Sequence, residues 1–321
     1  MSLLKCLRFK QGQRDIHEKC ASHLFFFGAN DYFLSMILQK NSQLVHLVQL
    51  LDDTDARMQE IVHQQLLNHS LQLIVNRSQL LPQLSSDALE RLHHFFLKNR
   101  DQLVLHALQQ LLHRPGDELD LEKSMTLLSF WNDPLVDYQE IHESLNRLAA
   151  EIATFLPSSG HPLVFLDHIN FVFFNRYKFQ GNHTDYFNAD NLFIDRVLKS
   201  RKGLPVSLGI VYLLIAQRLQ LPIFGVSMPM HFLLKFYNGE DEIFFDVFNE
   251  GKIYSREECL RFLHNAHHED PEGVLKGAEP LEIFSRVLKN LRIIYASYSP
   301  DADKHAFIND VIKLVNPGKL A

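Results

Sequence analysis

The hydrophobic period of the chain changes from helical to strand-like at Pro222, and this change restricts the fold more than any other feature. From Ser207 onward, apolar residues recur at the spacing of a helix that is packed into a core. After Pro222, runs rich in aromatic and β-branched residues predict strands at residues 224–228, 231–237 and 242–247. Asn238-Gly239, between the last two runs, is a strong hairpin signal. The expected fold class is therefore α+β, with one central helix packed on a small antiparallel sheet.

Helical patterns flank this central unit on both sides. Apolar stripes at residues 44–51 and 58–66 enclose an acidic turn, which is the layout of one helical-hairpin repeat of the HEAT kind. The turn Pro115-Gly116-Asp117 then interrupts the helical pattern. Two further amphipathic helices at residues 279–315 resemble a tetratricopeptide-type hairpin. We expect three units: a helical, HEAT-like N-terminal domain at residues 1–116, the α+β core at 117–276 and the helical hairpin at 277–321.

The composition is that of an ordinary globular protein, with 46% hydrophobic and 22% charged residues. Its formal net charge is −6 and no basic block stands out, so the sequence gives no electrostatic case for binding nucleic acid. No window approaches the roughly 20 apolar residues that span a bilayer, and the N-terminus does not read as a signal peptide. Three widely spaced cysteines fit a reducing compartment. We therefore expect a cytoplasmic protein without a membrane partner.

The high count of 18 histidines invites a metal hypothesis, but their spacing does not support it. The pairs His93-His94 and His267-His268 are adjacent, so on a helix the two rings of each pair point in different directions. The sequence has no H-E-x-x-H motif and no paired cysteines at zinc spacing. Cys259, at a predicted helix start, is expected to be a buried structural thiol. We expect neither a metal nor another cofactor.

Three residues could carry acyl-transfer chemistry: Ser207, His231 and Asp246. Ser207 opens the predicted helix directly after a Gly-x-Pro sequence, so its simplest role is to cap that helix. As a nucleophile it would need His231 as a general base, because a helix dipole does not bring a hydroxyl near ionisation. Asp246 lies among aromatic residues, where an unpaired carboxylate is costly to bury. It either pairs with His231 on the adjacent strand or faces solvent, and the pattern leaves both open.

These three residues belong to a longer ordered series of recognisable positions. The series runs Gly181-Asn182, Tyr186, Asn188, Asn191, Val197-Leu198, Arg201 to Leu208, Ala216, Arg218-Leu219, Gly225-Val226, Pro229, His231-Phe232-Leu233, Asp246, Phe248-Asn249, Gly251, Arg286 to Leu291 and Asn316-Pro317. Over roughly residues 118 to 318 it resembles the SirB-type transglutaminase-like family. The resemblance implies a transglutaminase-like α+β core with helical flanks.

Residue by residue, the resemblance places the transglutaminase nucleophile position at Ser207, the histidine at His231 and the aspartate at Asp246. Serine is also usual in this family at the first of these positions. The supporting positions that the resemblance indicates are Tyr186, Asn188, Asn191, Gly203 and Pro205. The chain departs from the family pattern where Met230 replaces a glycine, Val247 a proline and Leu192 a serine. We expect Met230 to narrow access to His231.

The sequence supports two main hypotheses about function. The leading one is a transglutaminase-like protein that lacks catalytic activity and acts as a binding or regulatory module for another protein, because serine replaces the catalytic cysteine and the helical flanks are long. The alternative is a serine-based hydrolase or acyltransferase in which Ser207 attacks, His231 is the general base and Asp246 orients it. A weaker third hypothesis assigns partner recruitment to residues 1–116.

Overall fold

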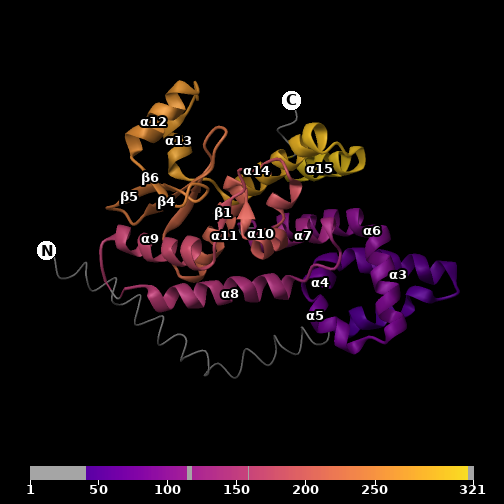
Figure 1. Cartoon of the computed structure of the whole chain (residues 1–321). Coiled ribbons are helices and arrows are strands. Elements are labelled where there is room, and N and C mark those ends of the chain that lie inside the picture. The colour runs from indigo at the N-terminus through magenta and orange to yellow at the C-terminus, as the bar shows by residue number, and fades with distance from the viewer. Residues whose placement is uncertain (1–40, 114–117, 158, 317–321) are drawn as a thin grey trace.

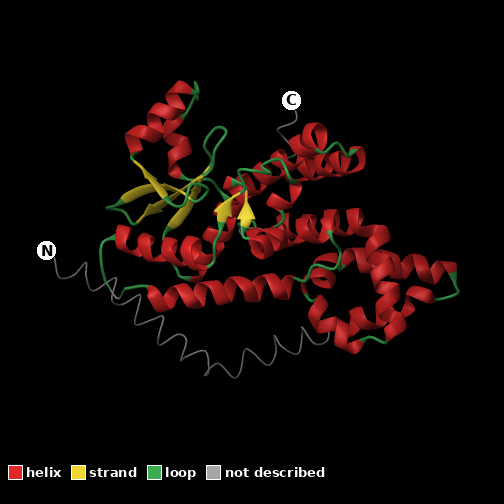
Figure 2. Cartoon of the chain, viewed as in Figure 1, coloured by secondary structure: helices red, strands yellow, loops and turns green. Residues whose placement is uncertain are grey.

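The computed structural model describes residues 41–113, 118–157 and 159–316. Helices make up most of this part of the chain, and strands are confined to one region (Figure 2). The helices before the sheet are α3 (Ala56–Asn68), α4 (Ser70–Val75), α5 (Arg77–Leu80), α6 (Ser86–Leu112), α7 (Leu121–Asn132), α8 (Tyr138–Phe155), α9 (Pro162–Asn170), α10 (Ile194–Ser200) and α11 (Pro205–Arg218). Those after it are α12 (Arg256–Asn265), α13 (Pro271–Lys276), α14 (Pro280–Ile293) and α15 (Ala302–Val315). Figure 1 shows α3 to α6 at one end of the molecule and strands β4 to β6 toward the other.

A four-stranded antiparallel sheet follows α11, as the change of period predicts. The strands are β3 (Ile223–Val226), β4 (Leu233–Tyr237), β5 (Glu242–Asp246) and β6 (Lys252–Tyr254), in that order across the sheet. The predicted hairpin joins β4 to β5, and its turn contains Gly239 at a φ of 93°, a left-handed value that glycine accepts without strain. The α+β fold class is confirmed. Two further features were not predicted from the sequence: β6, and the two-stranded parallel pair of β1 (Gln180–Gly181) and β2 (Lys202–Gly203).

The sheet is covered on both faces, so its central strand β4 is buried along most of its length. Leu234 and Phe236 face the main core, which also contains most of α11. Leu233 faces a second, smaller cluster with Cys259 of α12 and Leu275 of α13. Gly209 allows α11 to pack closely against the ring of Phe232, because a Cβ added at this glycine would lie 2.6 Å from that ring. The central helix is thus held directly against the strands that carry the candidate site.

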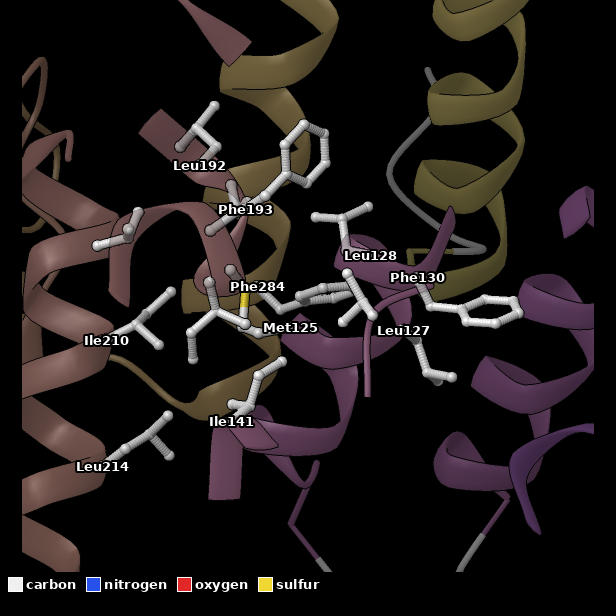
Figure 3. Close-up of a cluster of buried hydrophobic side chains, with 14 of the residues drawn as sticks. Met125, Leu127, Leu128, Phe130, Ile141, Leu192, Phe193, Ile210, Leu214 and Phe284 are labelled. Carbon is white, nitrogen blue, oxygen red and sulfur yellow. The ribbon is translucent and has the colours of Figure 1, made fainter. Parts of the chain in front are cut away.

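The main buried core is continuous from the N-terminal helices to α15. Figure 3 shows a part of it, in which Met125 of α7, Ile210 of α11 and Phe284 of α14 lie together. Trp131 of α7 stacks on Phe307 of α15 at a centroid distance of 4.4 Å, and its indole N–H donates to Asp101 of α6 at 2.8 Å. Phe96 and Phe130 meet edge to face between α6 and α7. The division into three units remains a prediction, and the described helices share one core across its expected boundaries. The tail forms two helices interrupted at residues 299–301, as expected.

Lys235 fastens α13 to the sheet from a position that is only 4% exposed. Its ammonium group donates to the carbonyls of Leu275 at 2.6 Å and Lys276 at 3.0 Å, and it lies 3.4 Å from Glu242 Oε1. These carbonyls belong to the last turn of α13, which a cation stabilises.

We expect Lys235→Met to lower the free energy of unfolding by about 1–3 kcal/mol, because two buried carbonyls lose their donor. Urea denaturation measures the loss, and hydrogen exchange should accelerate across α12 and α13. Lys252→Met, which removes an exposed lysine of the same sheet, is the control and should change stability by less than about 0.5 kcal/mol. Equal losses in the two variants would contradict the capping role.

Candidate functional site: a buried His–Asp pair beside a small cavity

Asp246 ends β5 and has no exposed surface. One carboxylate oxygen accepts hydrogen bonds from the backbone N–H groups of Phe248 at 2.9 Å and Asn249 at 3.3 Å. The other accepts from the side-chain amide of Asn249 at 2.6 Å and lies 2.7 Å from His231 Nε2. Asp246 therefore faces inward, and its negative charge is met by donors on both oxygens.

His231 lies two residues before β4, in the loop that follows β3, and not at the start of the strand as the sequence pattern predicted. Burial alone would raise the pKa of Asp246, but the hydrogen bond and the charge of His231, together with the donors from Asn249 and Phe248, hold that pKa below its ordinary value. Asp246 is therefore ionised near neutral pH, and Nε2 of the ring donates the proton between them. Nδ1 is left as the ring nitrogen that can meet another group.

Ser207 is the third residue of α11, and its hydroxyl is bonded to the backbone around it. The Oγ atom accepts from the N–H of Leu204 at 2.9 Å and donates to the carbonyl of Asn191. The serine is 2% exposed, and Gly203 leaves room for it, because an added Cβ there would lie 2.7 Å from the Oγ atom. Among the described residues, the structure records no hydrogen bond between Ser207 and His231. Helix α11 begins at Pro205, two residues before the predicted start, so Ser207 does not occupy the N-cap position but bonds the N–H of the N-cap residue Leu204 from within the first turn. Its contacts are those of a residue that stabilises the helix start and not those of a nucleophile.

The supporting residues connect Ser207 to the loop before α10. The side chain of Asn191 is 4% exposed and donates to the carbonyls of Asp185 and Tyr186 at 2.7 and 3.2 Å, and its backbone carbonyl receives the Ser207 hydroxyl. Asn188 caps the 3-10 turn Ala189–Leu192 by accepting from Asp190 N at 2.9 Å. Polar groups of this loop thus hold Tyr186 and the start of α11 together.

A cavity of about 260 Å³ opens beside His231. Its walls include Tyr186, Leu204, Pro205, Val206, His231 and Arg286. The side chain of His231 is 29% exposed, whereas Ser207 does not line the cavity. A molecule in this cavity therefore reaches the imidazole and not the hydroxyl.

Met230 has a φ of 57°, in the left-handed region that favours the glycine usual in the resembling family. Its side chain lines the cavity but is 94% exposed. The residue therefore lies at the mouth of the cavity, where it adds apolar surface without covering the imidazole completely. That Met230 narrows access to His231 stays a prediction.

Arg286 brings a guanidinium to the cavity wall and was not among the predicted site residues. It comes from α14, about 40 positions beyond Asp246, and donates to Ser227 Oγ at 3.1 Å. Its place in the ordered series of matching positions was the only signal in the sequence that could have suggested a role. The position of Arg286 on the same cavity as His231 depends on the packing of α14 against α11, which no local pattern reveals.

The thiol of Cys259 lies in the smaller hydrophobic cluster beside the sheet and lacks the properties of a nucleophile. The residue is 3% exposed, and burial raises the pKa of the thiol to about 11, so it is protonated near neutral pH. Cys6 and Cys20 lie outside the described residues. Within the described ranges, no group of three or more His, Cys, Asp or Glu side chains is arranged to hold a metal ion.

Comparison with known proteins identifies the class of domain that contains this site. Residues 139–289 match the family model described as the Transglutaminase-like superfamily, so the chain contains a transglutaminase-like domain. This domain includes Ser207, His231, Asp246 and Arg286. No solved structure matches the chain.

Particular relatives come from both animals and bacteria. F-box only protein 21 of Mus musculus is 30% identical over 190 residues, which cover 50% of this chain and 30% of that protein. A UPF0162 protein of Vibrio cholerae is 32% identical over 161 residues, covering 50% of this chain and 58% of the relative. UPF0162 protein YchA of Escherichia coli is 29% identical over 172 residues, covering 48% and 58%. The chain thus matches only about a third to three-fifths of the length of these relatives.

In the described part of the chain, no helix has the length and apolar character needed to cross a membrane.

Proposed function

We propose that this chain is a non-catalytic transglutaminase-like protein of the SirB type that acts as a binding or regulatory module for another protein. The observation that carries the proposal is the state of the Ser207 hydroxyl. It is buried, and both its proton and its acceptor capacity are used by backbone groups at the start of α11. The His231–Asp246 pair then serves as a hydrogen-bonded centre that shapes the cavity.

The energetics of the serine support this reading. To act as a nucleophile, Ser207 would have to leave the carbonyl of Asn191 and the N–H of Leu204, and each buried group left without a partner costs about 1–3 kcal/mol. The hydroxyl would also need to reach Nδ1 of His231, since Nε2 is engaged by Asp246. A residue that holds two loops together is thus ill suited to attack a substrate.

We expect a fluorophosphonate probe to leave the folded protein unlabelled at Ser207, and amide and ester acyl donors to show no turnover that depends on this residue. Ser207→Ala should instead lower the free energy of unfolding by about 1–3 kcal/mol, because it removes the buried hydroxyl. Mass spectrometry of probe-treated protein and urea denaturation provide the two measurements. Labelling or turnover that is lost in both Ser207→Ala and His231→Ala would overturn the proposal.

The second candidate function is a serine-based hydrolase or acyltransferase. The feature that favours it is the His231–Asp246 pair, in which an ionised carboxylate fixes the imidazole tautomer at 2.7 Å and leaves Nδ1 available as a base. Ser207 would attack, and the first turn of α11 would supply backbone N–H groups to an oxyanion. The probe experiment separates this function from the leading one.

The partner that we propose is another protein, and the compartment is the cytoplasm. The exposed apolar residues around the cavity, Met230, Phe187 and Ile293, support a protein partner. Cys259 is a free thiol, which agrees with a reducing compartment.

A further inference from the structure

Arg286 is a largely enclosed cation that has no carboxylate partner among the described residues. Its only recorded side-chain hydrogen bond goes to a neutral hydroxyl, that of Ser227 at 3.1 Å. Burial lowers the pKa of the guanidinium, although Tyr186 and Glu282 act in the opposite direction. A partly buried charge without a close counter-ion is incompletely solvated, so a guanidinium that lines a cavity in this state indicates a place for an anionic group.

The other walls of the cavity agree with this polarity. His231 presents its ring, which can donate or accept a hydrogen bond. Pro205 and Val206 are the first two residues of α11, so the positive end of the helix dipole faces the same space. Asn290, one turn after Arg286 on α14, adds a neutral amide. Among the residues that the structure describes, no acidic side chain lines the cavity.

Apolar residues surround this polar centre at the surface. Met230 is 94% exposed, Ile293 49% and Phe187 43%, and all three line the cavity. Phe187 stacks on Tyr298, which is also exposed, at a centroid distance of 3.5 Å. This rim offers contact area to aliphatic and aromatic side chains next to one bound anion, a combination that a polypeptide supplies and a free inorganic ion does not.

We propose that the cavity binds a carboxylate of another polypeptide through Arg286, with an apolar side chain of that polypeptide held against the rim of Met230, Phe187 and Ile293. The inference rests on the proposed function as a protein-binding module and names the chemistry of its ligand. A volume of about 260 Å³ suits a side-chain-sized group rather than a large cofactor. A guanidinium binds a carboxylate through paired, charge-assisted hydrogen bonds, which accounts for the specificity.

The test uses hydrocinnamate, an aromatic carboxylate, and its amide as probes on the full chain labelled at the methionine methyl groups. We expect hydrocinnamate to shift the Met230 methyl resonance, and expect the amide to bind at least about tenfold more weakly. Arg286→Gln should weaken hydrocinnamate at least about tenfold, whereas Arg286→Lys should retain part of the affinity. Lys289→Gln removes an exposed charge from the same helix and should change affinity by less than about twofold.

Three results would overturn the inference. One is the absence of a Met230 shift up to about 20 mM hydrocinnamate. Another is equal binding of the acid and the amide, or of wild type and an Arg286→Gln variant that melts at the wild-type temperature. The third is tighter binding of inorganic phosphate than of hydrocinnamate, which would assign the cavity to phosphate. None of them concerns serine labelling, so failure here leaves the non-catalytic proposal intact.

Two further probes identify the source of the carboxylate. N-acetylphenylalanine carries a chain-terminal carboxylate, whereas the α-amide of N-acetyl-phenylalanyl-glutamate carries only a side-chain carboxylate. Tighter binding of the first assigns the cavity to polypeptide C-termini, and tighter binding of the second assigns it to internal acidic residues. Both results support the inference, and loss of binding for both in Arg286→Gln is expected.

Discussion

Asp246→Ala is expected to lower the free energy of unfolding by about 3–5 kcal/mol, one of the two largest effects that we predict for a single substitution in this chain. The carboxylate has no exposed surface and is contacted by donors from His231, Phe248 and Asn249. Its removal leaves these donors without an acceptor and frees the loop that carries His231. Urea denaturation can be followed through the single tryptophan, Trp131, which is buried in α7.

Two controls separate this effect from a general loss of negative charge. Asp303→Ala removes an exposed carboxylate in the first turn of α15 and should cost less than about 1 kcal/mol. Asp246→Asn keeps an acceptor for the backbone N–H groups, so we expect a loss smaller than that of Asp246→Ala. If Asp246→Ala cost no more than Asp303→Ala, the carboxylate would not be the centre of this network.

The same carboxylate gives stability a defined pH dependence. The pKa of Asp246 is lowered on folding, so its ionised form stabilises the native state. This contribution is fully present above the ordinary aspartate pKa of about 4 and is lost as the pH falls through that value toward the lower pKa of the folded state. The stability difference between wild type and Asp246→Asn should therefore shrink as the pH falls from about 4 toward the lower pKa of the folded state. A difference that grows as the pH falls below about 4 would contradict the lowered pKa.

Local chemistry in the sequence predicted the central part of the fold. Apolar spacing predicted α11, the aromatic and β-branched runs predicted β3 to β5, and Asn238-Gly239 predicted the hairpin between β4 and β5. The pairing of Asp246 with His231 was one of the two alternatives that the sequence left open, because a carboxylate among aromatic residues needs a partner when buried. These features depend on neighbours that are close in the chain or across one hairpin.

Features that depend on distant segments could not be predicted. The hydroxyl of Ser207 donates to the carbonyl of Asn191, 16 residues earlier, and so joins the segment that follows β1 to the helix that follows β2. The cation of Arg286 reaches the cavity from α14, which follows the whole sheet. Short strands such as β2 carry too few residues for a period to emerge. Ser207, His231 and Asp246 could thus be named as candidate residues from the sequence. The hydrogen bonds that hold the Ser207 hydroxyl could not be predicted.

Arg218→Met is expected to produce the other large effect, a loss of about 3–5 kcal/mol, because it breaks a buried ion pair from one side. Arg218, in the last turn of α11, donates to Glu122 of α7 at 2.7 Å, to Asn146 of α8 at 2.7 Å and to the carbonyl of Leu214 at 3.0 Å. The side chain of Glu122 is 11% exposed and also lies 2.7 Å from His142 Nδ1. Without the guanidinium, the carboxylate keeps its contacts with His142 and with the hydroxyl of Tyr138 but loses its arginine cation in a poorly solvated position. Urea denaturation followed through Trp131 measures the loss.

A double-mutant cycle shows whether the cost lies in the orphaned charge. Glu122→Gln removes that charge, so Arg218→Met combined with Glu122→Gln should be more stable than Arg218→Met alone by about 1–3 kcal/mol. Arg147→Met, which removes an exposed arginine of α8 whose ion pair with Glu143 is 3.9 Å long, is the matched control and should cost less than about 1 kcal/mol. Because Arg218 anchors the C-terminal end of the same helix whose first turn holds Ser207, its loss should also accelerate hydrogen exchange along α11. Additive losses in the double mutant would mean that the pair acts through packing and not through its charges.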